Sequence, residues 1–359
     1  MHHRDCVVTD RGGVIENRHQ VHAAVVDAKG KLLFAVGNPH RVTLARSAAK
    51  PAQTLAILET GAFDPTVSEG ADIALMCASH SAEDRHLQRT YDMLKRIGAE
   101  EEDLRCGGHA ALSDKVNRMW IKNDFVPGPA TNNCSGKHCG MIAGSKALGA
   151  SVENYHLPDH PMQMRVKQVV SDLTAPNIGN DEVQWALDGC NLPAPAFPLR
   201  CLAGMYASFA DAADGNHDIK TERHDHMARV FNSMVEFPEY VGGDDRYCTE
   251  LMRAYAPSLI GKLGADGCYG VGIRASADTE RLGATGALGI AVKIEDGSIE
   301  ILYAAVTEIL EQLQIGTSEQ RKKLDHFHHL ERRNTVNTVT GKVTLAFSVR
   351  PNDEGAQAL

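Results

Sequence analysis

Residues 21–36 read VHAAVVDAKGKLLFAV, and this stretch shows how the fold begins. Residues 21–27 are mostly apolar and β-branched, residues 28–30 have turn chemistry, and residues 31–36 resume the apolar run. The pattern predicts two strands joined by a tight turn. Similar β-like runs separated by glycines return near the other end of the chain, at residues 267–275, 285–294 and 336–349.

The middle of the chain has helical spacing instead. Helix formers dominate residues 47–58, 140–148, 162–173 and 201–213, and helical spacing recurs at residues 299–313. Ser81 reads as the N-cap of a further helix that follows a short buried run at residues 73–77. A sheet built from both chain ends, with helices inserted between, is α+β architecture. We expect one two-lobed domain, with a sheet lobe at residues 1–45 and 255–359 and a helical lobe at residues 46–254.

Composition excludes several classes of function. The chain has 359 residues and a formal net charge of −9, whereas a nucleic-acid binder carries a basic stripe and an anionic membrane surface repels acidic proteins. A transmembrane helix needs about 20 consecutive apolar residues, and the sequence contains no such run. The first six residues, MHHRDC, lack the apolar region of a secretory signal. Together with an odd number of cysteines, nine, this predicts reduced thiols in the cytoplasm.

The glycines of the late strands do not form a nucleotide-binding loop. Such a loop needs G-x-G-x-x-G between a strand and a helix, and the late glycines lack this spacing. These glycines are Gly270, Gly272, Gly283, Gly286 and Gly289.

The first candidate for chemistry is Ser47-Ala48-Ala49-Lys50. Residues three apart share a helix face, so this hydroxyl and amine can meet. Serine needs a neighbouring base to act as a nucleophile, and lysine can serve only where burial or a nearby cation lowers its pKa. A solvated helix face explains the same four residues, so the motif alone leaves both interpretations open.

Two later motifs favour catalysis. Ser79-His80-Ser81 follows the buried run, and Lys262-Leu263-Gly264 precedes the last strands. This order matches that of the motifs in penicillin-recognising serine enzymes, where the second serine and the late lysine face the nucleophile. Ser79 and Lys262 would then form a second Ser-Lys pair. The middle motif lacks the usual asparagine, and Leu263 stands where threonine is usual.

A third group of reactive side chains lies at residues 132–140, NNCSGKHCG, and a further thiol follows at Cys190. Thiolates at a helix N-terminus have lowered pKa values and bind soft metals. The C-x2-C pairs of structural zinc sites are absent, so these residues form either an irregular metal site or packing cysteines. The polar neighbours of Cys134 are poorly suited to a core.

Taken together, these segments resemble the bacterial L-asparaginase family of the Rhizobium etli type, also called the thermolabile or asparaginase II family. The likeness runs over most of the chain. Its motifs are Arg11-Gly12-Gly13 with Glu16 and His19, Arg46 to Gln53, Cys77 to Ser81, Cys106 to His109, Asn133 to His138, Asp188-Gly189-Cys190, and Gly261 to Gly267. One departure is Gly108, where the family has proline.

The resemblance implies a fold similar to serine β-lactamases and glutaminases, and an amidohydrolase that converts L-asparagine to L-aspartate and ammonia. By the same resemblance Ser47 is the nucleophile, Lys50 its base, and Ser79 with Lys262 the second catalytic pair. It also implies a homodimer.

The resemblance further implies a zinc ion (Zn2+) held by Cys134, Lys137 and Cys190 beside the active site. A lysine ligand must be deprotonated, which the metal itself would drive. Arg46, His138 and Asp188 neighbour these positions, and we expect them to contact substrate.

Two other functions fit the same residues. A glutaminase or a β-lactam-recognising hydrolase would use the same scaffold, since one extra methylene changes substrate discrimination by only ~1–3 kcal/mol. A non-catalytic zinc-binding or amide-binding protein is the alternative outside enzymes, although it has no need for two Ser-Lys pairs.

Overall fold

The computed structural model describes residues 5–63, 69–176, 178, 183–215 and 219–352. The chain divides into two compact units. Unit 1 comprises Met1–Ala48, Phe197–Asp214 and Ala254–Leu359, and unit 2 comprises Ala49–Ala196 and Gly215–Arg253. In the described part of the chain, no helix is both long enough and apolar enough to span a bilayer.

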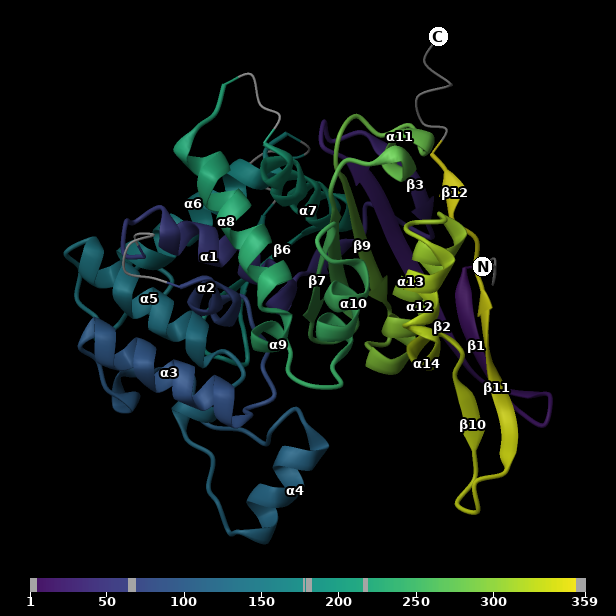
Figure 1. The fold of residues 1–359 in the computed structure, drawn as a ribbon, viewed down its shortest axis with the longest axis horizontal. Helices are drawn as coiled ribbons and strands as arrows, with labels where there is room; N and C mark the ends of the chain where they lie inside the picture. The colour runs from purple at the N-terminus through teal and green to yellow at the C-terminus, as the bar shows by residue number, and fades with distance from the viewer. Residues whose placement is uncertain (1–4, 64–68, 177, 179–182, 216–218, 353–359) are drawn as a thin grey trace. The chain divides into compact units, whose positions relative to one another are not determined.

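Unit 1 contains an antiparallel sheet in the order β10-β11-β1-β2-β9-β8-β7, in which β3 also pairs with β2 and β12 pairs with β3 (Figure 1). The strands and helices of unit 1 are β1 (Cys6–Arg11), β2 (Val14–Asp27), β3 (Leu32–Val36), β4 (Val42–Leu44), α7 (Leu199–Asp214), β7 (Leu259–Gly264), β8 (Cys268–Ile273), α11 (Ala277–Arg281), β9 (Leu288–Ile294), α12 (Ile299–Gln312), α13 (Ser318–Lys322), α14 (Asp325–His328), β10 (Glu331–Arg333), β11 (Val339–Ala346) and β12 (Arg350–Pro351). The predicted antiparallel sheet from both chain ends is therefore confirmed, and the architecture agrees with the α+β class.

Unit 2 is mainly helical. Its elements are α1 (Lys50–Leu58), α2 (Gly70–Met76), α3 (Asp84–Ile97), η2 (Glu101–Asp103), α4 (Asp114–Lys122), η3 (Pro129–Thr131), α5 (Ser135–Ala147), α6 (Pro161–Thr174), β5 (Gln184–Leu187), α8 (Glu222–Glu236) and α9 (Pro238–Val241). Three elements span the division between the units: η1 (Arg46–Ala49), β6 (Pro193–Pro198) and α10 (Tyr247–Tyr255).

The sheet of unit 1 is covered on both faces because glycines let α7 lie directly against it. A Cβ at Gly289 would collide with the Ala203 carbonyl of α7, and one at Gly270 would collide with the Tyr206 ring. Residues 269 and 270 face opposite sides of β8. The Tyr269 ring meets Tyr303 of α12, so α12 covers the other face. Burial on both sides explains why every residue of β9 is buried, with no polar alternation.

Helix α7 belongs to the same unit as the sheet. The sequence analysis had placed it in the helical lobe at residues 46–254. Three of the late glycines, Gly270, Gly272 and Gly289, leave the space in which this helix packs on the sheet.

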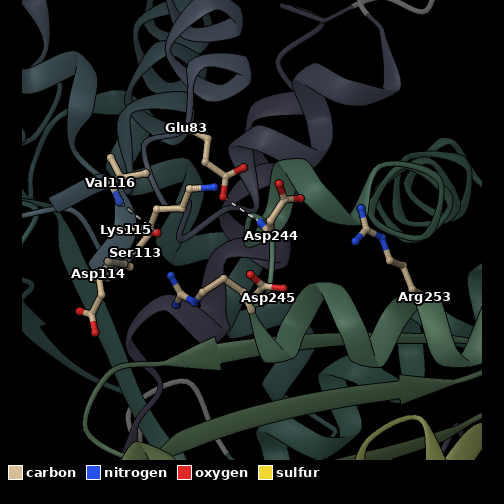
Figure 2. Close-up of a pocket in the computed structure, with 10 residues that line it drawn as sticks. Glu83, Ser113, Asp114, Lys115, Val116, Asp244, Asp245 and Arg253 are labelled. Atoms are coloured by element: carbon tan, nitrogen blue, oxygen red, sulfur yellow. Dashed lines mark hydrogen bonds between the residues drawn. The ribbon is translucent and has the colours of Figure 1, made fainter. Parts of the chain in front are cut away.

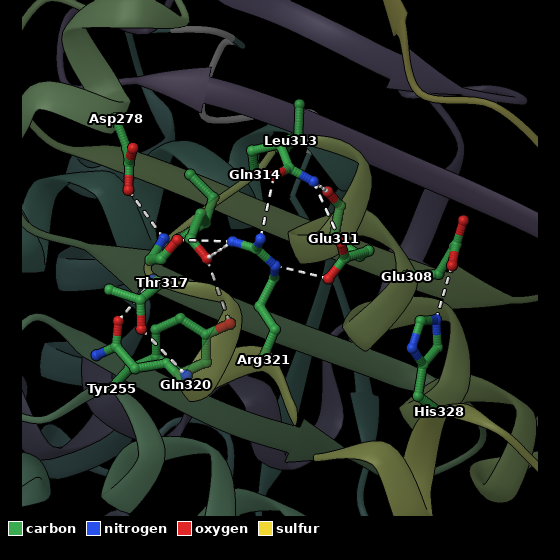
Figure 3. Close-up of polar contacts among 12 residues, drawn as sticks. Tyr255, Asp278, Glu308, Glu311, Leu313, Gln314, Thr317, Gln320, Arg321 and His328 are labelled. Carbon is green, nitrogen blue, oxygen red and sulfur yellow. Dashed lines mark hydrogen bonds and ion pairs between the residues drawn. The ribbon is translucent and has the colours of Figure 1, made fainter. Parts of the chain in front are cut away.

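The carboxy-terminal helices of unit 1 are fastened by one arginine (Figure 3). The Arg321 guanidinium pairs with the Glu311 carboxylate at 2.6 Å and donates to the Gly316 carbonyl at 2.6 Å. The backbone N–H of Gly316 donates to Asp278 at 2.8 Å. Arg321 is only 10% exposed, so these bonds join α12, α13 and the end of α11 in a partly desolvated environment.

In unit 2, a stripe of glycines brings α5 close to its neighbours. Gly136, Gly140 and Gly144 lie four residues apart on one face of α5. A Cβ at Gly136 would collide with the Leu75 backbone at the end of α2, and one at Gly144 with Met162 of α6. Each glycine costs a helix about 1 kcal/mol of propensity, which close packing offsets. The first turn of α5 is thereby pressed against the end of α2.

One prediction about local structure near this contact was wrong. The buried run at residues 73–77 is the end of α2 and its C-cap, Cys77. The N-cap of α3 is Glu83, not Ser81. Ser81 Oγ instead donates to the Gly242 carbonyl at 3.0 Å, and Ala82 turns left-handed with φ of 56°, which delays the helix by two residues.

A buried carboxylate joins α2 to α3. Asp72 is completely buried and accepts two hydrogen bonds from Arg96, at 2.6 and 2.8 Å. Arg89 adds a bond at 3.3 Å, and the Glu69 backbone N–H donates from the start of α2. A buried charge is tolerated only when its lone pairs are matched in this way.

We predict that Asp72→Asn destabilises the protein by about 3 kcal/mol, because the amide cannot match two arginines and leaves charge uncompensated. Urea unfolding followed by circular dichroism measures this loss. The control is Asp92→Asn on the exposed face of α3, whose side chain bonds only Gln88. Equal stability of the two variants would contradict the role of Asp72.

Candidate active site

The turn that carries Ser47 is held within unit 1. Arg46 has a left-handed backbone with φ of 50°, which is uncommon for a residue with a side chain and is a form of strain that accumulates at functional sites. The Arg46 guanidinium pairs with Asp266. The Tyr206 hydroxyl of α7 donates to the Ala48 carbonyl at 2.8 Å. Ser47 itself is half-buried.

Lys262 lies on β7 in the same unit as Ser47. A Cβ at Gly264 would collide with the Ala45 carbonyl, so the end of β7 lies against the Ser47 turn. Residues 262 and 264 face the same side of the strand. Lys262 is completely buried and its Nζ donates to the Leu263 carbonyl at 2.7 Å. The fold therefore directs this lysine toward the side of β7 on which the Ser47 turn packs.

Lys50 and Ser79 are in contact within unit 2. Lys50 is completely buried at the start of α1, and its Nζ lies 3.2 Å from Ser79 Oγ. The same Nζ donates to the Ala78 carbonyl. The Ser79 backbone N–H donates to the Val241 carbonyl at 3.0 Å. This bond holds the segment that follows the end of α2, and with it the Ser79 side chain. The sequence motifs predicted a Ser47–Lys50 pair and a Ser79–Lys262 pair. They did not predict the contact between Lys50 and Ser79.

Two histidines support the Ser79 segment. The His80 and His86 rings stack at 4.9 Å with 12° between their planes. The Nδ1 atoms of the two rings accept from backbone N–H groups at 3.1 Å. A neutral imidazole has one acceptor and one donor, so Nε2–H of His80 donates to Ser135 and that of His86 to the Glu239 carbonyl. Burial and neighbouring cations hold the pKa of His80 well below its usual range, and burial lowers that of His86 to about 4.

The structure brings Cys134, Lys137 and Cys190 together. Lys137 Nζ lies 3.2 Å from Cys190 Sγ, and Cys134 Sγ lies 2.9 Å from the Asn133 side-chain oxygen. The Cys134 hydrogen bond and the Lys137 charge hold the pKa of Cys190 well below its usual range, against the effect of burial. The same bond, with burial, raises the pKa of Cys134 to about 12. Although burial opposes its charge, Lys137 has a raised pKa because Cys190, Cys134 and Asp188 favour the ammonium.

This donor set fits a soft metal ion. Two sulfurs and one nitrogen converge in a buried space, and zinc takes both donor types in tetrahedral sites that can leave a fourth position open. In the described ranges, no three His, Cys, Asp or Glu side chains are grouped to hold a metal.

The predicted substrate contacts occupy three different environments. Arg46 pairs with Asp266, as described above. His138 is completely buried, its Nδ1 lies 2.6 Å from the Tyr155 hydroxyl, and burial with the Lys137 charge lowers its pKa to about 3. Asp188 is half-buried in the turn before Cys190, where it accepts from the Gly189 N–H at 2.7 Å. His138 is therefore shielded from solvent, whereas Arg46 and Asp188 remain partly exposed.

Two supporting residues were missed by sequence reasoning. The Asn132 amide donates to the Cys106 and Gly107 carbonyls at 3.0 and 2.9 Å, and its oxygen accepts from the Cys134 N–H at 2.8 Å. Tyr155 accepts from the Arg105 N–H at 2.9 Å while it contacts His138. The asparagine doublet before Cys134 is a visible signal for the first, but nothing in the sequence marks Tyr155.

The sequence of the chain matches a known protein family. The profile of the family described as L-asparaginase II matches residues 7–345. The chain belongs to this family. Membership covers both Ser-Lys segments and the thiol cluster, and at the level of the family it implies amidohydrolase activity on asparagine. No curated protein matches the chain.

The two stacked histidines generate a prediction about pH. Each is neutral in the folded protein but binds a proton near pH 6.5 once unfolded, so the unfolded state gains protons below that pH. Stability is therefore full above pH 6.5 and falls as the pH decreases toward the folded pKa. From pH 7 to pH 5, His86 alone should cost about 2 kcal/mol.

The measurement is urea unfolding at pH 7 and pH 5 for the parent and for His86→Gln, which retains a donor and an acceptor but does not titrate here. The variant should lose less stability than the parent by about 2 kcal/mol. An identical loss in both proteins would show that His86 is not the group responsible.

Proposed function

We propose that this chain is an L-asparaginase that hydrolyses L-asparagine to L-aspartate and ammonia through a serine nucleophile activated by lysine. Family membership supports the substrate. The observation that carries the mechanism is the contact between the buried Lys50 amine and the Ser79 hydroxyl, because a serine needs a neighbouring base of this kind to move its proton. The antiparallel sheet with inserted helices suits a fold like that of serine β-lactamases.

The reaction follows acyl-transfer chemistry. Ser47 Oγ attacks the side-chain amide carbon while Lys50, one helical turn further along the chain, takes the hydroxyl proton. The C–N bond then breaks, and the proton passes to the leaving nitrogen to give ammonia. Water hydrolyses the acyl-enzyme to L-aspartate, and Lys50 again removes a proton from the attacking oxygen.

Ser79 and Lys262 have supporting roles in this scheme. The 3.2 Å contact between Ser79 and Lys50 supports Ser79 as a proton relay. Lys262, buried on the face of β7 toward the Ser47 turn, supplies positive potential near the nucleophile. Arg46 and Asp188 are our candidates for the charged α-groups of the substrate, since each carries a charge of the required sign and remains partly accessible.

Cys134, Lys137 and Cys190 would hold a zinc ion beside this site. When bound, the ion supplies a Lewis-acidic position that can orient substrate groups. The nine free, buried cysteines suit a reducing cytoplasm, where thiols of this kind stay reduced.

A protruding ribbon supports a homodimer. The first half of β2 and the loop between β10 and β11 expose Val14 (73%), Ile15 (50%) and Val336 (77%). These segments lie beside β1 in one sheet. We propose a second copy as the partner that covers these three apolar side chains, and sedimentation equilibrium of the purified chain measures the association.

Ser47→Ala should reduce L-asparagine turnover at least about a thousandfold, because no other hydroxyl replaces the nucleophile. Ser79→Ala should reduce turnover less than Ser47→Ala, because it removes the relay but not the nucleophile. Ammonia release and a thermal melt are measured for each variant. The control is Ser208→Ala on α7, whose hydroxyl bonds only the Gly204 carbonyl. Turnover by Ser47→Ala within about tenfold of the parent would end the assignment.

For zinc, we expect one ion per chain after dialysis, as measured by elemental analysis. The double variant Cys134→Ala/Cys190→Ala should lose it, because both sulfur ligands are gone. The control pair Cys6→Ala/Cys201→Ala removes two buried thiols elsewhere and should retain it. Full zinc content in the first variant would place the ion at another site.

A further inference from the structure

A charged cavity in unit 2 lies apart from the residues proposed for catalysis and for zinc binding. Its volume is about 780 Å³, and Figure 2 shows the side chains around it. Neither Ser-Lys residues nor thiols line it. One wall comes from the start of α4, with Ser113, Asp114 and Lys115, and the other from Glu83, residues 244–246 and Arg253.

The lining carries both signs of charge, and part of that charge is uncommitted. Glu83 and Asp244 pair with Arg85, and Arg253 pairs with Glu250. In the part of the chain that the structure describes, the side chains of Asp114, Lys115 and Asp245 form no ion pair. Two carboxylates and an ammonium are therefore available to a ligand in this cavity.

Arg246 adds a second available cation. One of its N–H groups donates to Ser81 Oγ at 3.2 Å, and a guanidinium has five such donors in a planar fork suited to carboxylates. Asp245 has a left-handed backbone with φ of 58°, next to Arg246 in the same short loop. The cavity thus presents two cations for a carboxylate and two carboxylates for an ammonium.

We propose that this cavity is a binding site for a small zwitterion that carries an ammonium and a carboxylate. Lys115 and Arg246 bind the carboxylate, while Asp114 and Asp245 bind the ammonium. A volume of about 780 Å³ is within the range of small-molecule sites and admits a free amino acid or a short peptide, which share this chemistry.

Hydrogen bonds connect the loop that lines this site to the Ser79 segment. Residues 241–246 and 79–83 are joined by bonds from the Ser79 N–H to Val241, from Ser81 Oγ to Gly242 and from the Asp244 N–H to Glu83. A ligand held by Arg246 therefore acts on a residue two positions from Ser79. The inference goes beyond the proposed function, because binding here requires no hydrolysis.

Trp120 of α4 provides a local reporter. It is 7% exposed and packs with Ala82 and with Val116, which lines the cavity. The chain has two tryptophans, so Trp185→Phe leaves Trp120 as the sole emitter. The experiment titrates this variant, combined with Ser47→Ala to prevent turnover, and follows tryptophan emission.

The ligands are glycine, L-aspartate and the dipeptide glycylglycine, with N-acetylglycine and glycinamide as analogues that lack one charge. A saturable change with any zwitterion is expected, and binding at least about tenfold weaker for both analogues. Response to glycine or L-aspartate identifies free amino acids as the ligand, and response to glycylglycine alone identifies short peptides. Equal binding of the analogues, or no saturable response, would overturn the proposal.

Site variants complete the test. Lys115→Met and Asp245→Asn should each weaken binding about tenfold or more, and asparagine tolerates the left-handed position. The matched control is Lys122→Met, an exposed lysine of α4 that does not line the cavity, and its affinity should equal the parent's. Unchanged affinity in both site variants would place the ligand elsewhere. Because the nucleophile is already removed, failure of the asparaginase assignment leaves these outcomes interpretable.

Discussion

The burial of the Lys50 amine constrains much of unit 2. A lysine amine removed from water loses its hydrogen bonds to solvent unless nearby groups replace them. Here the Ala78 carbonyl and the Ser79 hydroxyl do so, and both lie just after α2. The end of α2 must therefore meet the start of α1, and α5 must approach closely enough to seal the space. The glycine stripe of α5 allows that approach.

The parts of the fold that could be predicted from sequence are those whose pattern is local. The hairpin at residues 21–36 and the helix at Pro161–Thr174 have strong periodicity, and both are present. β7 (Leu259–Gly264) was not recognised as a strand because its LIGKLG sequence is buried throughout and shows no alternation. The N-cap of α3 was misplaced by two residues because Ser81 bonds to Gly242, 161 residues further along the chain. Local capping rules carry no information about such a partner.

The site shows the same division between local and distant information. The S-x-x-K motif specified Lys50, but the contact with Ser79 depends on how α1 and α2 pack. Cys190 lies 53 residues beyond Lys137, and only the resemblance to a family had placed the two together. No sequence motif marked Tyr155, because its contribution is a single hydrogen bond between its hydroxyl and His138. Supporting residues of this kind are defined by geometry rather than by residue type.

Three lysines are almost completely removed from solvent: Lys50, Lys137 and Lys262, each at most 1% exposed. Their hydrogen bonds include a carbonyl and a hydroxyl for Lys50, a sulfur for Lys137 and a carbonyl for Lys262. Well-packed apolar residues of similar volume would often stabilise a core more than such buried charges do. Two of the three contact a serine or a thiol, so we infer that their place in the core serves chemistry rather than stability. The rigid glycine-lined packing around them is the structural condition under which amines can stay buried and still reach their partners.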